Sequence, residues 1–345
     1  MIWLTWRQFR GQAIATAALL GAFAIALAVT GARLVSAYDA NGIPGCHASG
    51  DCARATGNFI NGLAGTPEML TFYATVFLLY ALPGLIGAFW GAPLVAREIE
   101  AGTLRLVWNQ SVTRERWLAT KLGMLGLAAA AATGLLTLMT AWWASPIYRA
   151  ARQAAAGPSR MSIDRISPAL FGASGIVPLG YGVFAFALGV TAGVLVRRTI
   201  PAMAATLAVF AGVQVAWPNW IRPHLLTPLH QTIALNVGRI DFISIGSNQM
   251  RVHAAVRHVG AWIISNQTIT AAGRPFTGPP TGACLGPSYR ACNAWLAAKH
   301  LRQVIVYQPA SRYWPLQWEE TALFVVLALI LAGVCGWRLR RRQQA

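Results

Sequence analysis

The sequence predicts an all-α polytopic membrane protein with about six transmembrane helices and a small mixed extracytoplasmic subdomain before the last helix. Of the 345 residues, 56% are hydrophobic and 11% are charged, whereas soluble globular chains carry about 25% charged residues. The apolar residues gather in long runs, and the arginines fall mostly in the gaps between these runs. This composition and pattern favour a membrane protein over a soluble one.

The placement of the arginines decides how the net charge of +18 is interpreted. A charge of this size would indicate nucleic-acid binding if it lay on one compact domain. Here the cations are placed to meet lipid headgroups or to lie in aqueous loops. We therefore expect the lipid bilayer, and not nucleic acid, as the partner of these residues.

Six apolar segments define the predicted spans. About 20 predominantly apolar residues, with a rise of about 1.5 Å each, cross about 30 Å of hydrocarbon. The segments that meet or nearly meet this length are 13–32, 70–96, 122–144, 170–196, 200–217 and 321–337. The second to sixth segments contain no Asp, Glu, Lys, Arg or His. Because ion-driven and proton-driven carriers keep an ionisable group at membrane depth, we expect another source of energy.

The orientation follows from Lys and Arg in the short segments that flank the spans. The N-terminus, the loop 97–121, the turn after the fourth span and the C-terminal tail all carry such residues, and six spans place them on one side. The sequence thus predicts a multi-pass protein of the cell (plasma) membrane with both termini cytoplasmic. The third loop disagrees, since it lies on the predicted outer side and carries Arg149, Arg152, Arg160 and Arg165.

The chain divides into three predicted regions. Residues 1–217 hold an N-terminal amphipathic helix and the first five spans, with the loop 97–121 between the second and third. Residues 218–320 mix apolar-alternating runs with turn-rich stretches, which is typical of a small folded extracytoplasmic subdomain. Residues 321–345 hold the sixth span and a basic cytoplasmic tail.

Four cysteines form two close pairs in segments predicted to lie outside the membrane: Cys46 with Cys52, and Cys284 with Cys292. Disulfides persist in oxidising compartments, so each pair could be bonded. Free thiols that are merely close in sequence are the alternative.

Small residues and hydroxyls form further patterns within the spans. Gly87 and Gly91, and likewise Gly189 and Gly193, are spaced to allow close helix approach in lipid, and we expect packing within the chain more than a dimer seam. Three threonines of the third span share one helical face, where they either line a path or bond to their own helix. They are Thr133, Thr137 and Thr140.

The loop after the second predicted span has the pattern of a short helix. Gly102 lets the chain leave the preceding helix, and Thr103 can cap a helix over 104–109. This helix would present an apolar face flanked by polar residues, formed by Leu104, Arg105, Val107, Trp108 and Asn109. Such a face can dock into a groove on a partner protein, and a helix that lies on lipid is the alternative.

The run 97–121 resembles the cytoplasmic loop of ABC-transporter permeases of the type-2 exporter superfamily, and the stretch 308–319 resembles the segment before their last span. The number of spans, the cytoplasmic termini and the long loop before the sixth span also match. The resemblance implies that the loop contains a coupling helix, which inserts into a cleft on a separate ATPase subunit. The residues it assigns to this contact are Glu98, Glu100, Thr103, Leu104, Arg105, Val107, Trp108, Asn109 and Gln110.

The N-terminal segment resembles the amphipathic connecting helix of the same superfamily. Trp6 and Phe9 share a face, while Arg7 and Arg10 can reach lipid phosphates. The residues expected at the membrane interface are Trp3, Trp6, Arg7, Phe9 and Arg10. A plain membrane anchor is the alternative and is compatible with this role.

The sequence predicts no ATPase activity in the chain itself. A P-loop needs Gly-Lys-Ser/Thr after a glycine-rich turn, and the two lysines, Lys121 and Lys299, follow Thr120 and Ala298 instead. The resemblance therefore implies a transport subunit that is not an enzyme and has no cofactor of its own. It also implies that ATP is bound by a partner ABC ATPase subunit and that the permease forms a homodimer or pairs with a similar permease. The histidine spacings match no compact metal motif.

Two other classes of function are alternatives to a transport subunit. A membrane-embedded enzyme acting on lipid-linked substrates would need converging acids in its external loop, which offers only Asp241 within it and Glu319 and Glu320 at its edge. A membrane sensor or scaffold would not depend on an ATPase. Within the transport hypothesis, uncharged spans favour an amphipathic or hydrophobic cargo.

Overall fold

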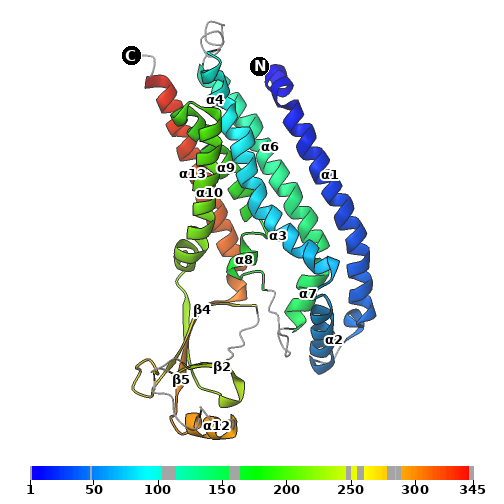
Figure 1. The fold of residues 1–345 in the computed structure, drawn as a ribbon, viewed down its shortest axis with the longest axis vertical. Coiled ribbons are helices and arrows are strands. Elements are labelled where there is room, and N and C mark those ends of the chain that lie inside the picture. Colours follow the sequence, from blue (N-terminus) through cyan, green and yellow to red (C-terminus); the bar gives the residue numbers. More distant parts are fainter. Residues whose placement is uncertain are drawn as a thin grey trace. The chain divides into compact units, whose positions relative to one another are not determined.

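The protein is described from a computed structural model that covers residues 2–46, 49–102, 114–154, 164–245, 250–254, 260–277, 284 and 289–341. It divides into two compact units (Figure 1). The helical unit comprises Met1–Leu225 and Tyr313–Ala345, and the smaller unit comprises Leu226–Arg312.

Six helices in the described ranges are long and apolar enough to cross a membrane, which confirms the predicted fold class. The elements of the helical unit are α1 (Ile2–Ala40), α2 (Ser49–Gly62), α3 (Pro67–Ile86), α4 (Ala92–Glu100), α6 (Arg114–Trp143), α7 (Ser145–Ala154), α8 (Pro168–Phe171), α9 (Val177–Val196), α10 (Thr199–Ala216) and α13 (Tyr313–Arg341). Two π-helical turns, η2 (Gly87–Gly91) and η3 (Trp217–Ile221), continue α3 into α4 and extend α10.

Both chain ends lie at one end of the helical unit (Figure 1). We call this the termini end, and we call the opposite end, which carries α2, α7 and α8, the far end. Helix α9 packs against α3, α4, α6, α10 and α13, and so forms the centre of the unit. Its packing is close because its glycines meet backbone: a Cβ atom on Gly189 would overlap the carbonyl oxygen of Gly87, and one on Gly193 would overlap that of Ala92. The paired glycines thus serve packing within the chain.

The fifth and sixth spans are longer than the sequence predicted. The fifth runs over Thr199–His224 and the sixth over Ala310–Arg338. The fifth span continues past residue 217 because the helix passes at Pro218 and Pro223 into a π-helical turn and then a 3-10 turn, in which each proline is the second residue. The extended spans include Arg222 and Glu320, so the prediction that the later spans lack ionisable residues is wrong.

Two further helix boundaries differ from the predictions. The N-terminal segment is not a separate amphipathic helix, because α1 runs without a break from Ile2 to Ala40. Alanine and leucine dominate this run, and both favour the helix. The fourth span begins at Val177 and not at residue 170, since the chain turns at Gly175 with a φ of +67°, a conformation that glycine adopts without strain.

The described residues of the smaller unit form two antiparallel sheets. Strand β5 (Arg302–Gln308) lies between β1 (Leu229–Ala234) and β4 (Trp262–Ile269), and β2 (Ile240–Ile245) pairs with β3 (Met250–Ala254). Leu229 lies opposite Tyr307, and Trp262 opposite Gln308. Helix α12 (Tyr289–Ala297) contributes to a core formed by Met250, Val252, Cys292, Leu296 and Leu301.

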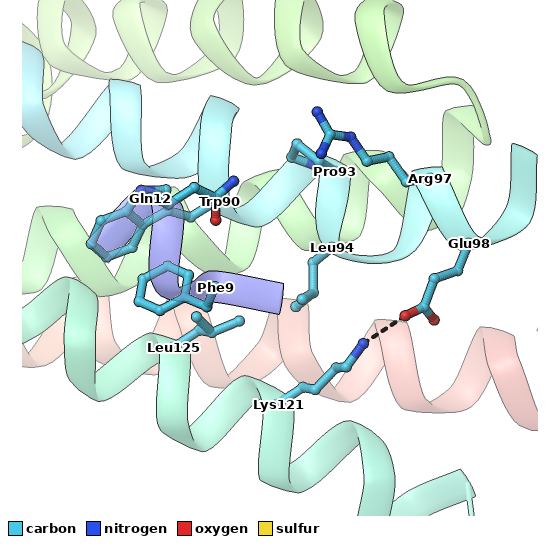
Figure 2. A pocket seen from close by; sticks show the side chains of 9 residues that line it. All are labelled: Phe9, Gln12, Trp90, Pro93, Leu94, Arg97, Glu98, Lys121 and Leu125. Carbon is cyan, nitrogen blue, oxygen red and sulfur yellow. Dashed lines mark hydrogen bonds and ion pairs between the residues drawn. The ribbon is translucent and has the colours of Figure 1, made fainter. Parts of the chain in front are cut away.

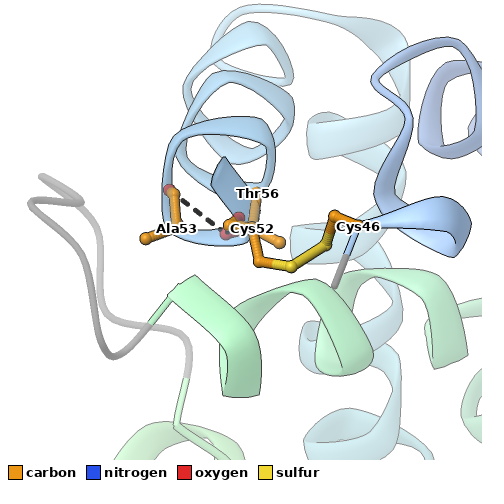
Figure 3. Close-up of a disulfide and its surroundings, with 4 residues drawn as sticks. All are labelled: Cys46, Cys52, Ala53 and Thr56. Carbon is orange, nitrogen blue, oxygen red and sulfur yellow. Dashed lines mark hydrogen bonds between the residues drawn. A yellow bond between two sulfur atoms is a disulfide. The ribbon is translucent and has the colours of Figure 1, made fainter. Parts of the chain in front are cut away.

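Both predicted cysteine pairs are bonded in the structure. Cys46 and Cys52 join the segment after α1 to the start of α2 (Figure 3), and Cys284 and Cys292 lie in the smaller unit. Next to the first bond, the Thr56 hydroxyl donates to the carbonyl oxygen of Cys52 at 2.6 Å. Cys335 is a free thiol, buried in α13.

Candidate functional site

A cavity at the termini end lies beside the predicted coupling loop. We call it the termini-end cavity; its volume is about 270 Å³, and its lining residues are Phe9, Gln12, Trp90, Pro93, Leu94, Arg97, Glu98, Lys121 and Leu125. Figure 2 shows these side chains converging from α1, η2, α4 and α6. Two sets of predicted residues thus meet here: Glu98 from the coupling set and Phe9 from the membrane-interface set.

An ion pair closes the base of the coupling loop. The Lys121 Nζ atom lies 2.6 Å from Glu98 Oε1 (Figure 2), and both side chains are largely shielded from solvent. Glu98 lies near the start of the loop 97–121, on α4, and Lys121 is its last residue, on α6, 23 residues later. The resemblance assigned Glu98 to the contact with the ATPase, and in the structure its carboxylate pairs with this lysine.

A second contact fastens the end of α4 to α10. The Glu100 carboxylate accepts hydrogen bonds from the Thr199 backbone N–H at 3.0 Å and from the Thr199 hydroxyl at 2.6 Å. Thr199 is the first residue of α10, and a carboxylate at a helix N-terminus complements the helix dipole. Helix α4 is therefore tied to α6 through Glu98 and to α10 through Glu100.

The remaining predicted coupling residues lie outside the described residues: Thr103, Leu104, Arg105, Val107, Trp108, Asn109 and Gln110. Among the predicted interface residues, Trp3 and Arg10 are exposed, and the Arg7 guanidinium lies 5.5 Å from the centre of the Trp3 ring. Phe9 is buried and packs edge to face on Trp90, with 4.7 Å between the ring centres. The side chain of Trp6 lies outside the described part.

Toward the far end, a buried polar cluster was missed by the sequence reasoning. Arg222 Nε and one terminal nitrogen donate to the two oxygens of Glu320 at 2.7 and 2.9 Å. The Tyr181 hydroxyl donates to Glu320 at 2.6 Å, and all three side chains are fully buried. Arg222 also donates to the carbonyl oxygen of Pro168 at 3.0 Å and covers the Phe171 ring.

This cluster joins the fourth, fifth and sixth spans. All three nitrogen atoms of the Arg222 guanidinium have hydrogen-bond partners. A charge can be buried in a low-dielectric region without a large free-energy cost only when it is paired in this way. The signal in the sequence was an arginine and a glutamate just beyond the predicted ends of two apolar runs. Their pairing across 98 residues was not visible there.

An apolar groove of about 670 Å³ lies along α3, α8 and α10. Its wall includes Phe77, Leu85, Leu207 and Phe210. The amide of Gln214 also lines it, and within the described ranges neither of its polar atoms has a hydrogen-bond partner. The groove is therefore mainly apolar and has the buried Gln214 amide in its lining.

The threonine face of the third span does not supply free donors. The hydroxyls of Thr133, Thr137 and Thr140 donate to carbonyl oxygens of their own helix at 2.8 to 2.9 Å. This confirms the interpretation in which these hydroxyls form hydrogen bonds with the backbone of their own helix, α6.

The fold and these sites agree with the comparison to known families. Residues 17–222, more than half of the chain, match the family model described as ABC-2 membrane transporter related. No curated protein and no solved structure is significantly similar to the chain. The match spans the first five transmembrane helices, including the segment that carries Glu98, Glu100 and Lys121. The chain therefore belongs to the ABC-2 membrane transporter related family and is a membrane subunit of an ABC transporter.

Proposed function

We propose that the chain is the permease subunit of an ATP-driven ABC exporter, which forms the translocation path and couples through the loop 97–121 to a separate ABC ATPase subunit. The observation that carries this proposal is the double fastening of α4. The Glu98–Lys121 pair joins it to α6, and the bonds from Thr199 to Glu100 join it to α10. A force applied to the loop would therefore reach three transmembrane helices together.

The packing of α9 supports transmission of such a movement into the bilayer. Helix α4 continues from η2, whose glycines lie directly against the backbone of α9. Contacts between backbone atoms leave little room for one helix to move without the other, because no flexible side chain lies between them. We infer that α4, η2 and α9 move as one block when the ATPase closes.

The apolar groove along α3 and α10 supports pairing with a second permease chain, either an identical one or a similar one. A groove that opens sideways does not enclose a path for a cargo. A partner permease facing it would close the path and cover the exposed Phe77, and the unpaired Gln214 amide would then face the interior.

The coupling loop can be tested with the double variant Leu104→Asp plus Trp108→Ala. A buried aromatic anchor and its apolar neighbours usually dominate a protein interface. We expect the amount of ATPase that co-purifies with the permease in mild detergent to fall at least tenfold, which corresponds to about 1.4 kcal/mol. Membrane insertion of the permease, measured by its yield and monodispersity, should not change.

The matched control for this experiment is Trp318→Ala, which removes an exposed tryptophan from α13. It should leave the bound ATPase unchanged. Stoichiometric ATPase on the loop variant would refute the coupling assignment. If no P-loop ATPase accompanies even the unmodified permease, the membrane enzyme and the scaffold become the better hypotheses.

The orientation of the helical unit can be tested through the Cys46–Cys52 bond at the far end. We propose that this end is extracytoplasmic and that both termini are cytoplasmic, because disulfides persist in oxidising compartments. In a variant whose other cysteines are serine (Cys284→Ser, Cys292→Ser, Cys335→Ser), an impermeant maleimide should label intact cells only after mild reduction. Labelling that requires permeabilised cells would place the far end in the cytoplasm and contradict the proposal.

A further inference from the structure

A second cavity of about 270 Å³ lies at the far end, among α3, α6, α7, α13 and the segment 173–176 that precedes α9. We call it the far-end cavity. Its lining combines the polar side chains Tyr148, Arg165, Ser174 and Tyr313 with the apolar side chains Phe72, Val76, Leu79 and Leu138. This size is near the lower end of the range of about 300–1,000 Å³ that is typical of small-molecule sites. The cavity is therefore suited to a headgroup and the first part of an attached chain.

Arg165 supplies the cavity with a positive charge that forms no ion pair with the residues that the structure describes. Its guanidinium carbon lies 4.2 Å from the centre of the Tyr148 ring, so one face of the group is covered. Its Nε atom is buried and has no hydrogen-bond partner, and the ion pairs of the described ranges involve Lys121 and Arg222 instead. The adjacent Asp164 does not pair with it within those ranges.

The contrast with Arg222 shows what is missing at Arg165. Arg165 is half-buried and Arg222 fully buried, and both lie over an aromatic ring. The Arg222 guanidinium, however, binds both carboxylate oxygens of Glu320, the Tyr181 hydroxyl and a carbonyl oxygen. A shielded guanidinium without such partners is costly to the fold. The chemistry at Arg165 therefore calls for an anion with acceptor oxygens that comes from outside the chain.

Tyr148 offers a second donor beside this charge. The described residues give its hydroxyl no hydrogen-bond partner, although the side chain is mostly buried and lines the cavity. Burial raises the pKa of Tyr148 to about 12, against the smaller lowering effect of Arg165. The phenol thus keeps its proton at neutral pH and can donate. The Tyr313 hydroxyl, in contrast, donates to Ser174 Oγ at 2.9 Å.

The apolar residues of the cavity lining favour an anion that carries a hydrocarbon chain. Leu138 lies near the far end of the third span and is 70% exposed, and Trp314 at the rim is 53% exposed. Tryptophan at the end of a span marks the membrane interface, so the cavity lies where headgroups meet acyl chains. Basic pockets between transmembrane helices bind lipid headgroups on the cytoplasmic side, and Arg165 offers a headgroup the same charge at the far end.

We propose that the far-end cavity binds one anionic amphiphile, with its phosphate or carboxylate headgroup held by Arg165 and Tyr148 and the start of its acyl chain against Phe72, Leu79 and Leu138. The proposal does not depend on the ATPase, because binding occurs on the permease alone. It also gives Arg165 a role on the side of the membrane where the positive-inside rule disfavours arginine.

The test uses the full-length permease, purified in a neutral maltoside detergent, with dimyristoyl phosphatidylglycerol, dimyristoyl phosphatidylcholine or inorganic phosphate as the probe. Native mass spectrometry counts bound lipid, and the midpoint of thermal unfolding reports stabilisation. We expect one phosphatidylglycerol per chain with at least tenfold preference over phosphatidylcholine. Inorganic phosphate should neither stabilise the protein nor compete, because it cannot use the apolar residues of the lining.

Arg165→Gln should lower the affinity for phosphatidylglycerol at least tenfold. The matched control is Arg149→Gln, since Arg149 also covers a tyrosine ring, that of Tyr38, but does not line the cavity. It should change the affinity less than twofold. Should Arg165→Gln fail to fold, Tyr148→Phe keeps the ring beneath the guanidinium and should weaken binding about threefold or more.

Three results would overturn the proposal. Phosphatidylglycerol bound equally by wild type and by either cavity variant would show that the headgroup lies elsewhere. An equal loss for Arg149→Gln would show a general effect of surface charge. Saturation of the site by inorganic phosphate alone would show a site for a free anion and would refute the amphiphile.

Discussion

Glu320→Gln is expected to destabilise the helical unit by about 3–5 kcal/mol, because it leaves the fully buried Arg222 without its counter-charge. The variant amide can accept from the guanidinium with one oxygen only, whereas the carboxylate accepts at 2.7 and 2.9 Å with two. The Tyr181 hydroxyl also loses the charged acceptor to which it donates at 2.6 Å. Thermal unfolding in mild detergent, followed by circular dichroism, measures the effect.

The adjacent residue provides the control for this prediction. Glu319→Gln removes the same charge from the same turn of α13, at a position that is not fully buried, so its unfolding midpoint should stay close to that of wild type. The double variant Arg222→Met plus Glu320→Met should recover most of the lost stability, since apolar residues of similar volume often replace a buried ion pair without loss. An unchanged midpoint for Glu320→Gln would contradict the assignment of a buried pair.

Gly189→Ala is expected to push α9 away from η2 at the centre of the helical unit. A Cβ atom at this position would overlap the carbonyl oxygen of Gly87 and lie 2.9 Å from the Ala92 backbone nitrogen. Because backbone atoms cannot rotate away, α9 must move from η2, and added volume in a packed core costs about 1–3 kcal/mol. We expect a lower unfolding midpoint, together with weaker transport where coupling passes through this contact.

Gly212→Ala on α10 is the matched control, since no atom lies within 4 Å of the added Cβ. Alanine favours the helix over glycine by about 1 kcal/mol, so this variant should be as stable as wild type or more stable. If Gly189→Ala behaved in the same way, α9 and η2 would not be in the close contact that the structure describes.

The local pattern of the chain was enough to identify a membrane protein with six spans. A lipid-exposed backbone has to satisfy its own hydrogen bonds, so long apolar runs form helices whatever surrounds them. The same local reasoning identified the two cysteine pairs that are bonded in the structure, since the two cysteines of a pair lie only 6 or 8 residues apart. It also located the family resemblance around Glu98 and Glu100.

Only the tertiary structure decided where the spans end and which charges they contain. Hydropathy sums residues that are neighbours in sequence. It therefore ended the fifth span before Arg222 and began the sixth span after Glu320. These residues lie 98 positions apart, and each is tolerated inside because the other neutralises it. The Glu98–Lys121 pair likewise joins residues that are distant in sequence. The position of Arg165 over the Tyr148 ring is also a product of the tertiary fold. Sequence alone thus determined the class of protein, because helix formation in lipid is local, whereas the buried charges needed partners that folding brings together.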